Sequence, residues 1–226
     1  MPAIPYEALL FDCDGVLVDS EPLVNAVLVE MLAEMGWSLS QKEAVSLFTG
    51  TMVRDHHALI LEKTGVAIDM AWEKHFRARR DRKLDAELVA IPGAPQAVAE
   101  LHREMAGRMA VASGADIGKV RMQLDKTGIA SWFGGKVFSG QDLAANKPAP
   151  DIYLHAARQL GADPARSAVI EDSLTGIRAG VASGATVYGY LPDTTRHVSE
   201  QAMRQAGAHA VFRHMAELPQ LLRQPL

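Results

Sequence analysis

Short apolar runs in this chain end at acidic side chains. The run Glu7 to Phe11 (EALLF) ends at Asp12, with Asp14 two positions later, and a second run ends at Glu171 and Asp172. A carboxylate can attack a phosphorus atom, while a second carboxyl group protonates the leaving oxygen and later activates water. Residues i and i+2 of an extended segment point the same way, so Asp12 and Asp14 suit these two roles. The pattern predicts phosphoryl transfer through an aspartyl-phosphate on Asp12.

Four carboxylates gathered at one site repel one another. At a few ångströms and an effective dielectric constant of about 20, one pair of like charges costs about 4 kcal/mol, and a phosphate dianion adds to the repulsion. A cation must therefore lie among them. Carboxylate oxygens without a cysteine or histidine cluster are ligands that suit Mg²⁺. We expect Mg²⁺ as the cofactor.

Groups that bind phosphate follow two other predicted strands. Ser113 offers a hydroxyl, Gly114 an amide at an expected helix start, and Lys147 an ammonium. Together they can bind the transferring phosphoryl oxygens and neutralise the charge that develops in the transition state. Each is a weak signal alone, and the ordered set predicts a phosphate site.

The elements that must position these residues alternate along the chain. Strands followed by helices of this length imply right-handed crossovers, hence a doubly wound parallel sheet in an α/β, Rossmann-like core. Ligands bind such sheets outside the carboxyl ends of the strands, where the acidic residues lie. The predicted strands cover 7–11, 109–112, 136–138, 168–170, 186–190 and 209–212, and the core helices cover about 95–104, up to 126, 151–160, 174–182 and 200–205.

The stretch between the first two strands is too long to be a connection. A crossover needs little more than a dozen residues, whereas the segment from about 18 to 90 carries only helical patterns. These patterns run from Pro22 to Met35, from a capping box at Ser40 and Glu43, from about 52 to 63, and from about 71 to 88. We predict a core of residues 1–17 and 91–226 and an inserted all-helical cap of residues 18–90.

The composition limits the partners. The net charge of -4, from 23 basic and 27 acidic residues among 226, leaves no basic surplus for nucleic acid or an anionic membrane, so a small molecule is the expected partner. The basic run Arg77 to Lys83 lies on a predicted cap helix and fits a solvated face or part of the substrate mouth better than a nucleic-acid site. The lone Cys13 excludes an internal disulfide, and no leader pattern opens the chain, which predicts a cytoplasmic protein. A monomer is expected because no heptad or long exposed apolar helix marks an interface.

Four segments resemble the haloacid dehalogenase superfamily, in the subgroup with a helical cap after the first motif. They are FDCDGVLVDSE (11–21), VASGAD (111–116), KPAPDIY (147–153) and IEDSLTGIRAG (170–180), in the family's order. The resemblance implies that Asp12 is the nucleophile and a metal ligand, and that Asp14 is the acid/base and a backbone-carbonyl ligand. It makes Asp172 a metal ligand supported by Glu171, with Ser113 and Lys147 on the phosphate.

The resemblance also bears on the reaction. Asp14 is similar to the phosphatase and mutase branches, since the dehalogenases lack this carboxyl group. The β-phosphoglucomutase branch has a histidine where this chain has Val24, which favours plain hydrolysis. The segment Phe48 to Arg54 resembles a cap loop that reaches over the substrate, with Arg54 as the candidate contact. The stretch Lys83 to Ala94 is similar to the return from cap to core in sugar and sugar-acid phosphatases.

The sequence therefore predicts a Mg²⁺-dependent phosphatase acting on a small phosphorylated metabolite, such as a sugar phosphate or a phosphosugar acid. A phosphomutase that returns the phosphoryl group to a sugar is the enzymatic alternative. A receiver-like phosphoacceptor domain is the alternative that is not an enzyme, but such domains are about half this length, lack a cap and have adjacent acids at the first strand end.

Overall fold

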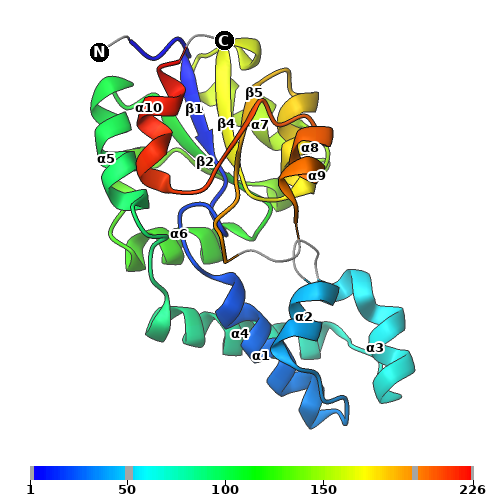
Figure 1. The fold of residues 1–226 in the computed structure, drawn as a ribbon. Helices are drawn as coiled ribbons and strands as arrows, with labels where there is room; N and C mark the ends of the chain where they lie inside the picture. The colour runs from blue at the N-terminus through cyan, green and yellow to red at the C-terminus, as the bar shows by residue number, and fades with distance from the viewer. Residues whose placement is uncertain (1–2, 49–52, 195–197, 225–226) are drawn as a thin grey trace. The chain divides into compact units, whose positions relative to one another are not determined.

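The computed structural model describes residues 3–48, 53–194 and 198–224 (Figure 1). The chain divides into two compact units: Met1–Asp19 with Val89–Leu226, and Ser20–Leu88. These divisions lie within two residues of the predicted bounds at 17/18 and 90/91.

The larger unit is built on a six-stranded sheet whose pairs are all parallel. The strands lie in the order β3-β2-β1-β4-β5-β6, so the winding direction reverses at β1, between β2 and β4. Such a reversal is where doubly wound sheets bind ligands. The strands are β1 (Ala8–Phe11), β2 (Met109–Ser113), β3 (Val137–Ser139), β4 (Ser167–Glu171), β5 (Thr186–Tyr190) and β6 (Ala210–Phe212).

The register brings three strand ends level. Phe11 of β1 pairs with Val111 of β2 on one side and with Ile170 of β4 on the other. Asp12 therefore comes level with Glu171, and Ser113 lies one residue further along β2. Residues distant in the sequence meet at this edge because parallel strands share the direction of their carboxyl ends.

Helices cover both faces of the sheet (Figure 1). On one face, Leu10, Ala110 and Val169 pack with residues of α7, α8 and α9 in one buried apolar cluster. On the other face, the ring of Phe11 packs edge to face against the ring of Phe133, and helices α5, α6 and α10 cover this face. The core helices are α5 (Ala94–Glu104), α6 (Ile117–Lys126), α7 (Asp151–Gln159), α8 (Leu174–Ala182), α9 (Glu200–Gln205) and α10 (Leu218–Leu222).

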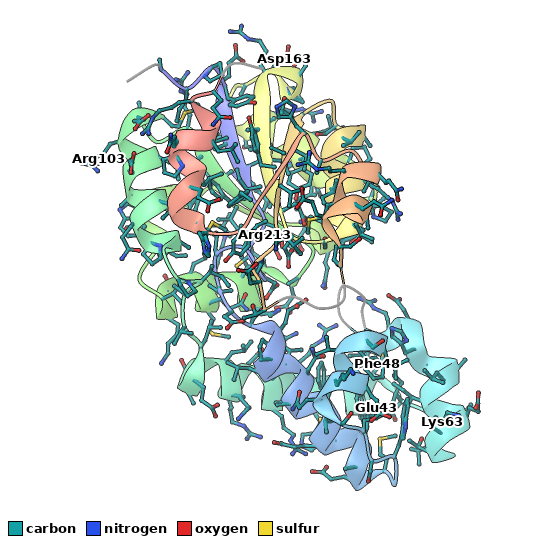
Figure 2. The ribbon with its side chains drawn as sticks, in the orientation of Figure 1. Glu43, Phe48, Lys63, Arg103, Asp163 and Arg213 are labelled. Carbon is teal, nitrogen blue, oxygen red and sulfur yellow. The ribbon has the colours of Figure 1, made fainter. Side chains whose placement is uncertain are left out.

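The smaller unit is helical in every element that the described residues form. It contains α1 (Glu21–Glu34), α2 (Gln41–Phe48), the 3₁₀ turn η1 (Val53–His56), α3 (His57–Thr64) and α4 (Met70–Glu87). Its buried cluster includes Leu28, Leu32, Phe48 and Phe76. The predicted capping box is present at the start of α2, where Ser40 and Glu43 exchange hydrogen bonds. Glu43 and Phe48 both belong to α2 (Figure 2).

The predicted α/β fold class is confirmed, and the predicted core strands and helices lie within a few residues of the observed ones. The C-terminal helix α10 was not predicted. It has five residues, LPQLL, which is too short for a helical period to be visible in the sequence. Across the described part of the chain, no helix combines the length and apolar character that crossing a bilayer requires.

Candidate active site

Asp12 follows β1 directly and is nearly buried. Its amide donates to the carbonyl of Ile170 at 3.0 Å, which extends the pairing with β4, and the residue is 7% exposed. The chain then turns sharply, with Gly15 at φ +75°. A Cβ on Gly15 would lie 2.0 Å from Oδ2 of Asp172. The Asp-Gly pair thus makes a turn and also leaves room for a second carboxylate.

Three carboxylates converge at the ends of β1 and β4. Asp12, Glu171 and Asp172 each offer an oxygen within 4.8 Å of the others. Lys147, in the connection from β3 to α7, donates to Asp12 at 2.6 Å and to Glu171 at 2.7 Å. The structure therefore brings together four residues that the sequence predicted for the site. They are Asp12 after β1, Glu171 at the end of β4, Asp172 after β4, and Lys147.

Glu171 is held from several directions. Its Oε1 accepts from Lys147 and, at 2.8 Å, from the hydroxyl of Tyr153. Its Oε2 accepts from the amides of Asp172 and Ser173 and from the Ser173 hydroxyl. These five hydrogen bonds fix a fully buried carboxylate, as burial of a charge requires.

The site carries strongly displaced pKa values. Burial raises the pKa of Asp12 to about 7, and the charges of Glu171 and Asp14 act in the same direction against the opposing effect of Lys147. Burial alone would also raise the pKa of Glu171, but Lys147 and the hydrogen-bond donors around it outweigh burial and lower that pKa. Burial would lower the pKa of Lys147, whereas Asp12 and Glu171 hold it well above its usual range. Lys147 thus stays a cation, and Asp12, which it contacts, still has a raised pKa because burial outweighs that contact.

The donor set fits a hard divalent cation. Three carboxylates and one ammonium leave two net negative charges at the cluster when all are ionised. Lys147 offsets only part of this charge, and the like charges of Glu171 and Asp14 add to the burial that raises the pKa of Asp12. Oxygen ligands of this kind suit Mg²⁺.

Asp14 faces a different neighbourhood. Its Oδ1 accepts from Nζ of Lys119 at 2.7 Å and from Nε2 of Gln123 at 2.9 Å, both on α6. Cys13, between the two acids, donates from its thiol to Oε1 of Gln123 at 3.7 Å. Burial, followed by the charges of Asp14 and Asp12, raises the pKa of Cys13 well above its usual range, so the thiol is not a nucleophile.

The expected helix start at Gly114 is wrong. Helix α6 begins at Ile117, because Asp116 is its N-cap and accepts from the amide of Lys119 at 2.9 Å. Gly114 lies in the loop before α6, and its carbonyl accepts a hydrogen bond from Nδ2 of Asn146 at 2.9 Å. Ser113 is fully buried at the end of β2 and accepts from the Ala115 amide at 3.1 Å. Ser113 thus ends the strand next to β1, whereas Gly114 lies in the loop that follows this strand, before the start of α6.

The remaining candidates belong to the helical unit. Arg54 lies in the 3₁₀ turn η1, and Val24 lies on α1, packed against the unit's buried cluster. Of the predicted substrate loop, residues 49–52 are outside the described part of the chain.

Sequence reasoning missed Lys119, Gln123, Tyr153 and Asn146, which hold the selected residues in place. Lys119 and Gln123 are four positions apart on α6, and that spacing on one helix face was the available signal. Tyr153 and Asn146 flank the Lys147-Pro148 motif within six residues, but the sequence did not show which site residues they touch.

Comparisons with known proteins agree on the family. Residues 6–184 match the model of haloacid dehalogenase-like hydrolases. A 6-phosphogluconate phosphatase of Escherichia coli (strain K12) is 30% identical over 216 residues, covering 95% of this chain and 94% of that protein. Protein CbbY of Cereibacter sphaeroides is 30% identical over 227 residues, covering 94% of each.

A similar solved structure is a HAD family hydrolase from Deinococcus radiodurans R1, which holds phosphate and sodium. It is 32% identical, covers 97% of this chain and 96% of its own, and superposes with a TM-score of 0.80. Because the family model spans well over half of the sequence and the relatives are matched nearly end to end, the chain belongs to the haloacid dehalogenase-like hydrolase family.

Proposed function

We propose that this enzyme is a Mg²⁺-dependent phosphatase that hydrolyses a small phosphorylated metabolite through an aspartyl-phosphate on Asp12. The observation that carries the proposal is the convergence of Asp12 with Lys147, Glu171 and Asp172 at the ends of β1 and β4. A buried carboxylate with a cation beside it is placed to receive a phosphoryl group and to have its charge masked during attack.

The first half-reaction transfers the phosphoryl group. A carboxylate oxygen of Asp12 attacks phosphorus, and the bond from phosphorus to the ester oxygen breaks. Asp14 gives its proton to that oxygen, which leaves as an alcohol. Lys147 and the Ser113 hydroxyl neutralise and bind the phosphoryl oxygens in the transition state.

The second half-reaction restores the enzyme. Asp14, now a carboxylate, takes a proton from water as its oxygen attacks phosphorus. The bond to the Asp12 oxygen breaks, inorganic phosphate leaves, and both aspartates regain their starting protonation. No external reactant other than water is needed.

The proposed metal ligands are the side chains of Asp12, Asp172 and Glu171 with the backbone carbonyl of Asp14. When bound, Mg²⁺ supplies positive charge between the nucleophile and the phosphoryl oxygens. The similar structure from Deinococcus radiodurans holds bound phosphate and sodium, which supports the proposal that this chain binds an anion and a cation.

The proposed substrate class is a sugar phosphate or a phosphosugar acid. The relative named as a 6-phosphogluconate phosphatase supports it, because the two chains match over nearly their whole lengths. Arg54 of the helical unit is the proposed substrate contact, and we propose that this unit acts as a cap, as the resemblance implied. A monomeric, cytoplasmic enzyme that binds neither nucleic acid nor membrane remains a prediction.

The test is phosphate release from a panel of sugar phosphates, phosphosugar acids and nucleotides, with Mg²⁺ or with a chelator. We expect release that requires Mg²⁺ and is abolished in Asp12→Asn, because the nucleophile is lost. Asp125→Asn, an exposed carboxyl on α6, serves as the matched control and should leave the rate unchanged. Isomerisation of a hexose phosphate without phosphate release would show a phosphomutase instead, and full activity in Asp12→Asn would remove Asp12 from its role.

A further inference from the structure

The carboxyl group of Asp14 is docked on helix α6. Its Oδ1 accepts two hydrogen bonds, at 2.7 Å from the Lys119 ammonium and at 2.9 Å from the Gln123 amide. These two donors are one helical turn apart, so they share one face of α6. A single helix therefore presents a pair of donors to one carboxylate oxygen.

Both donors are buried, which is unusual for their types. Gln123 is fully buried and Lys119 is 8% exposed. Lysine is rarely buried unless paired, and an unpaired buried amide or ammonium is costly. Asp14 supplies the pairing. The contact thus rests on two buried donors, while the Asp14 side chain stays 23% exposed.

The direction of the Gln123 amide is also set. The Cys13 thiol donates to its Oε1, so its Nε2 end is turned to Asp14. The position of Lys119 is set by Asp116, which caps the first turn of α6 and accepts from the Lys119 amide. Cys13 and Asp116 therefore help to fix the two donors that contact the Asp14 carboxyl group.

We propose that Lys119 and Gln123 are positioning residues that hold the Asp14 carboxyl group where it exchanges a proton with the leaving-group oxygen. This inference rests on the proposed function, since it concerns the acid in that reaction. A general acid works only within hydrogen-bond reach of the oxygen it protonates, and a misplacement of about 1 Å can cost a hundredfold in rate. Asp14 lies in a turn after β1, where side-chain contacts must fix the carboxyl group.

Two esters with different leaving groups distinguish a residue that positions the acid from a residue that only supports the fold. An alkyl phosphate expels an alkoxide that needs a proton, whereas p-nitrophenolate leaves without one. A misplaced acid therefore slows the alkyl ester and spares p-nitrophenyl phosphate. A damaged fold slows both esters alike.

The experiment compares kcat/KM for p-nitrophenyl phosphate with that for the alkyl phosphate cleaved fastest in the panel above. Because kcat/KM reports the steps up to formation of the phosphoenzyme, it keeps the dependence on the leaving group. We expect Lys119→Met and Gln123→Met to lower kcat/KM for the alkyl ester roughly 10- to 100-fold, mostly through kcat, and to change p-nitrophenyl phosphate by less than about threefold. Lys119→Arg should restore part of the loss, and Lys126→Met, exposed at the end of α6, should show none.

Asp14→Asn provides an internal reference. It should show the same dependence on the leaving group, and adding Lys119→Met to it should cause little further loss, because both changes act on one proton transfer. Equal losses on the two esters, unchanged rates, or a full additive loss in the double variant would overturn the inference. A wild-type enzyme that released phosphate from no ester would instead overturn the proposed function.

Discussion

Tyr153 shows how one side chain ties two motifs together. Its hydroxyl donates to Glu171 at 2.8 Å, and the Lys147 ammonium lies over its ring, 4.9 Å from the centroid. Burial and the neighbouring Glu171 raise the pKa of this phenol well above its usual range, so it remains a donor. Tyr153 therefore connects Lys147, the proposed phosphate-binding lysine, to a carboxylate of the acidic cluster.

Tyr153→Phe keeps the ring beside Lys147 and removes the donor to Glu171. We expect a loss of about 1–3 kcal/mol in the free energy of unfolding, because the hydrogen bond reaches a charged group. The Mg²⁺ concentration for half-maximal activity should rise about tenfold or more, as for other residues that orient metal ligands. Urea denaturation and a Mg²⁺ titration of activity measure the two effects.

Tyr188→Phe is the matched control, since its hydroxyl bonds Tyr6 at 2.6 Å in another part of the core. It should lower stability without changing the Mg²⁺ requirement. An unaltered Mg²⁺ requirement in Tyr153→Phe as well would mean that Glu171 does not depend on Tyr153.

Helix α8 approaches the site closely through a glycine. Gly176 stands in its first turn, where a Cβ would lie 1.6 Å from Oε1 of Glu171 and 1.9 Å from its Cδ. Glu171 is fully buried and cannot move aside without breaking its hydrogen bonds. The absence of a side chain at this position lets the helix start against the carboxylate.

Gly176→Ala should destabilise the protein by about 1–3 kcal/mol, as overpacking does, and should suppress activity because Glu171 is displaced. Gly118→Ala is the comparison, since it stands in the first turn of α6 and its Cβ would meet only Asp116 Oδ1, at 3.5 Å. That change should be neutral or stabilise by up to about 1 kcal/mol, the helix preference of alanine over glycine. Equal unfolding midpoints for the two variants in urea would contradict the close approach at Gly176.

At the scale of the whole molecule, the sequence predicted the fold class and the strand ends better than the contacts of the site. Periodicity in the chain is local, so strands such as 186–190 could be predicted to the residue. The pairing of Lys119 with Asp14 joins residues 105 positions apart, and it depends on how α6 packs beside the β1 turn. The predicted helix start at Gly114 was wrong, since the N-cap of α6 is Asp116, two residues after Gly114. Local patterns in the sequence thus predicted strands and helices, but they could not predict side-chain contacts that form only when the elements pack together.

The burial of Asp12 couples its protonation to the stability of the folded chain. Burial, with Glu171 and Asp14, raises its pKa from an ordinary value of 3.8 to about 7. The folded protein therefore holds this proton more tightly than the unfolded chain does. Between about pH 4 and pH 7 the unfolded aspartate is ionised while the folded one is protonated, so without metal the contribution of Asp12 to stability falls as pH rises.

Asp12→Asn should remove that part of the pH dependence, because an amide does not titrate. In a chelator, the variant should gain stability relative to the wild type as the pH rises from 5 to 8. Mg²⁺ at pH 8 should stabilise the wild type, since a ligand that binds only the folded state raises its stability, and should stabilise the variant much less. Urea midpoints at each pH, with chelator and with Mg²⁺, measure these differences. If the difference in stability between the two proteins stayed constant with pH, Asp12 would not be the titrating group. If both proteins responded equally to Mg²⁺, Asp12 would not be a ligand.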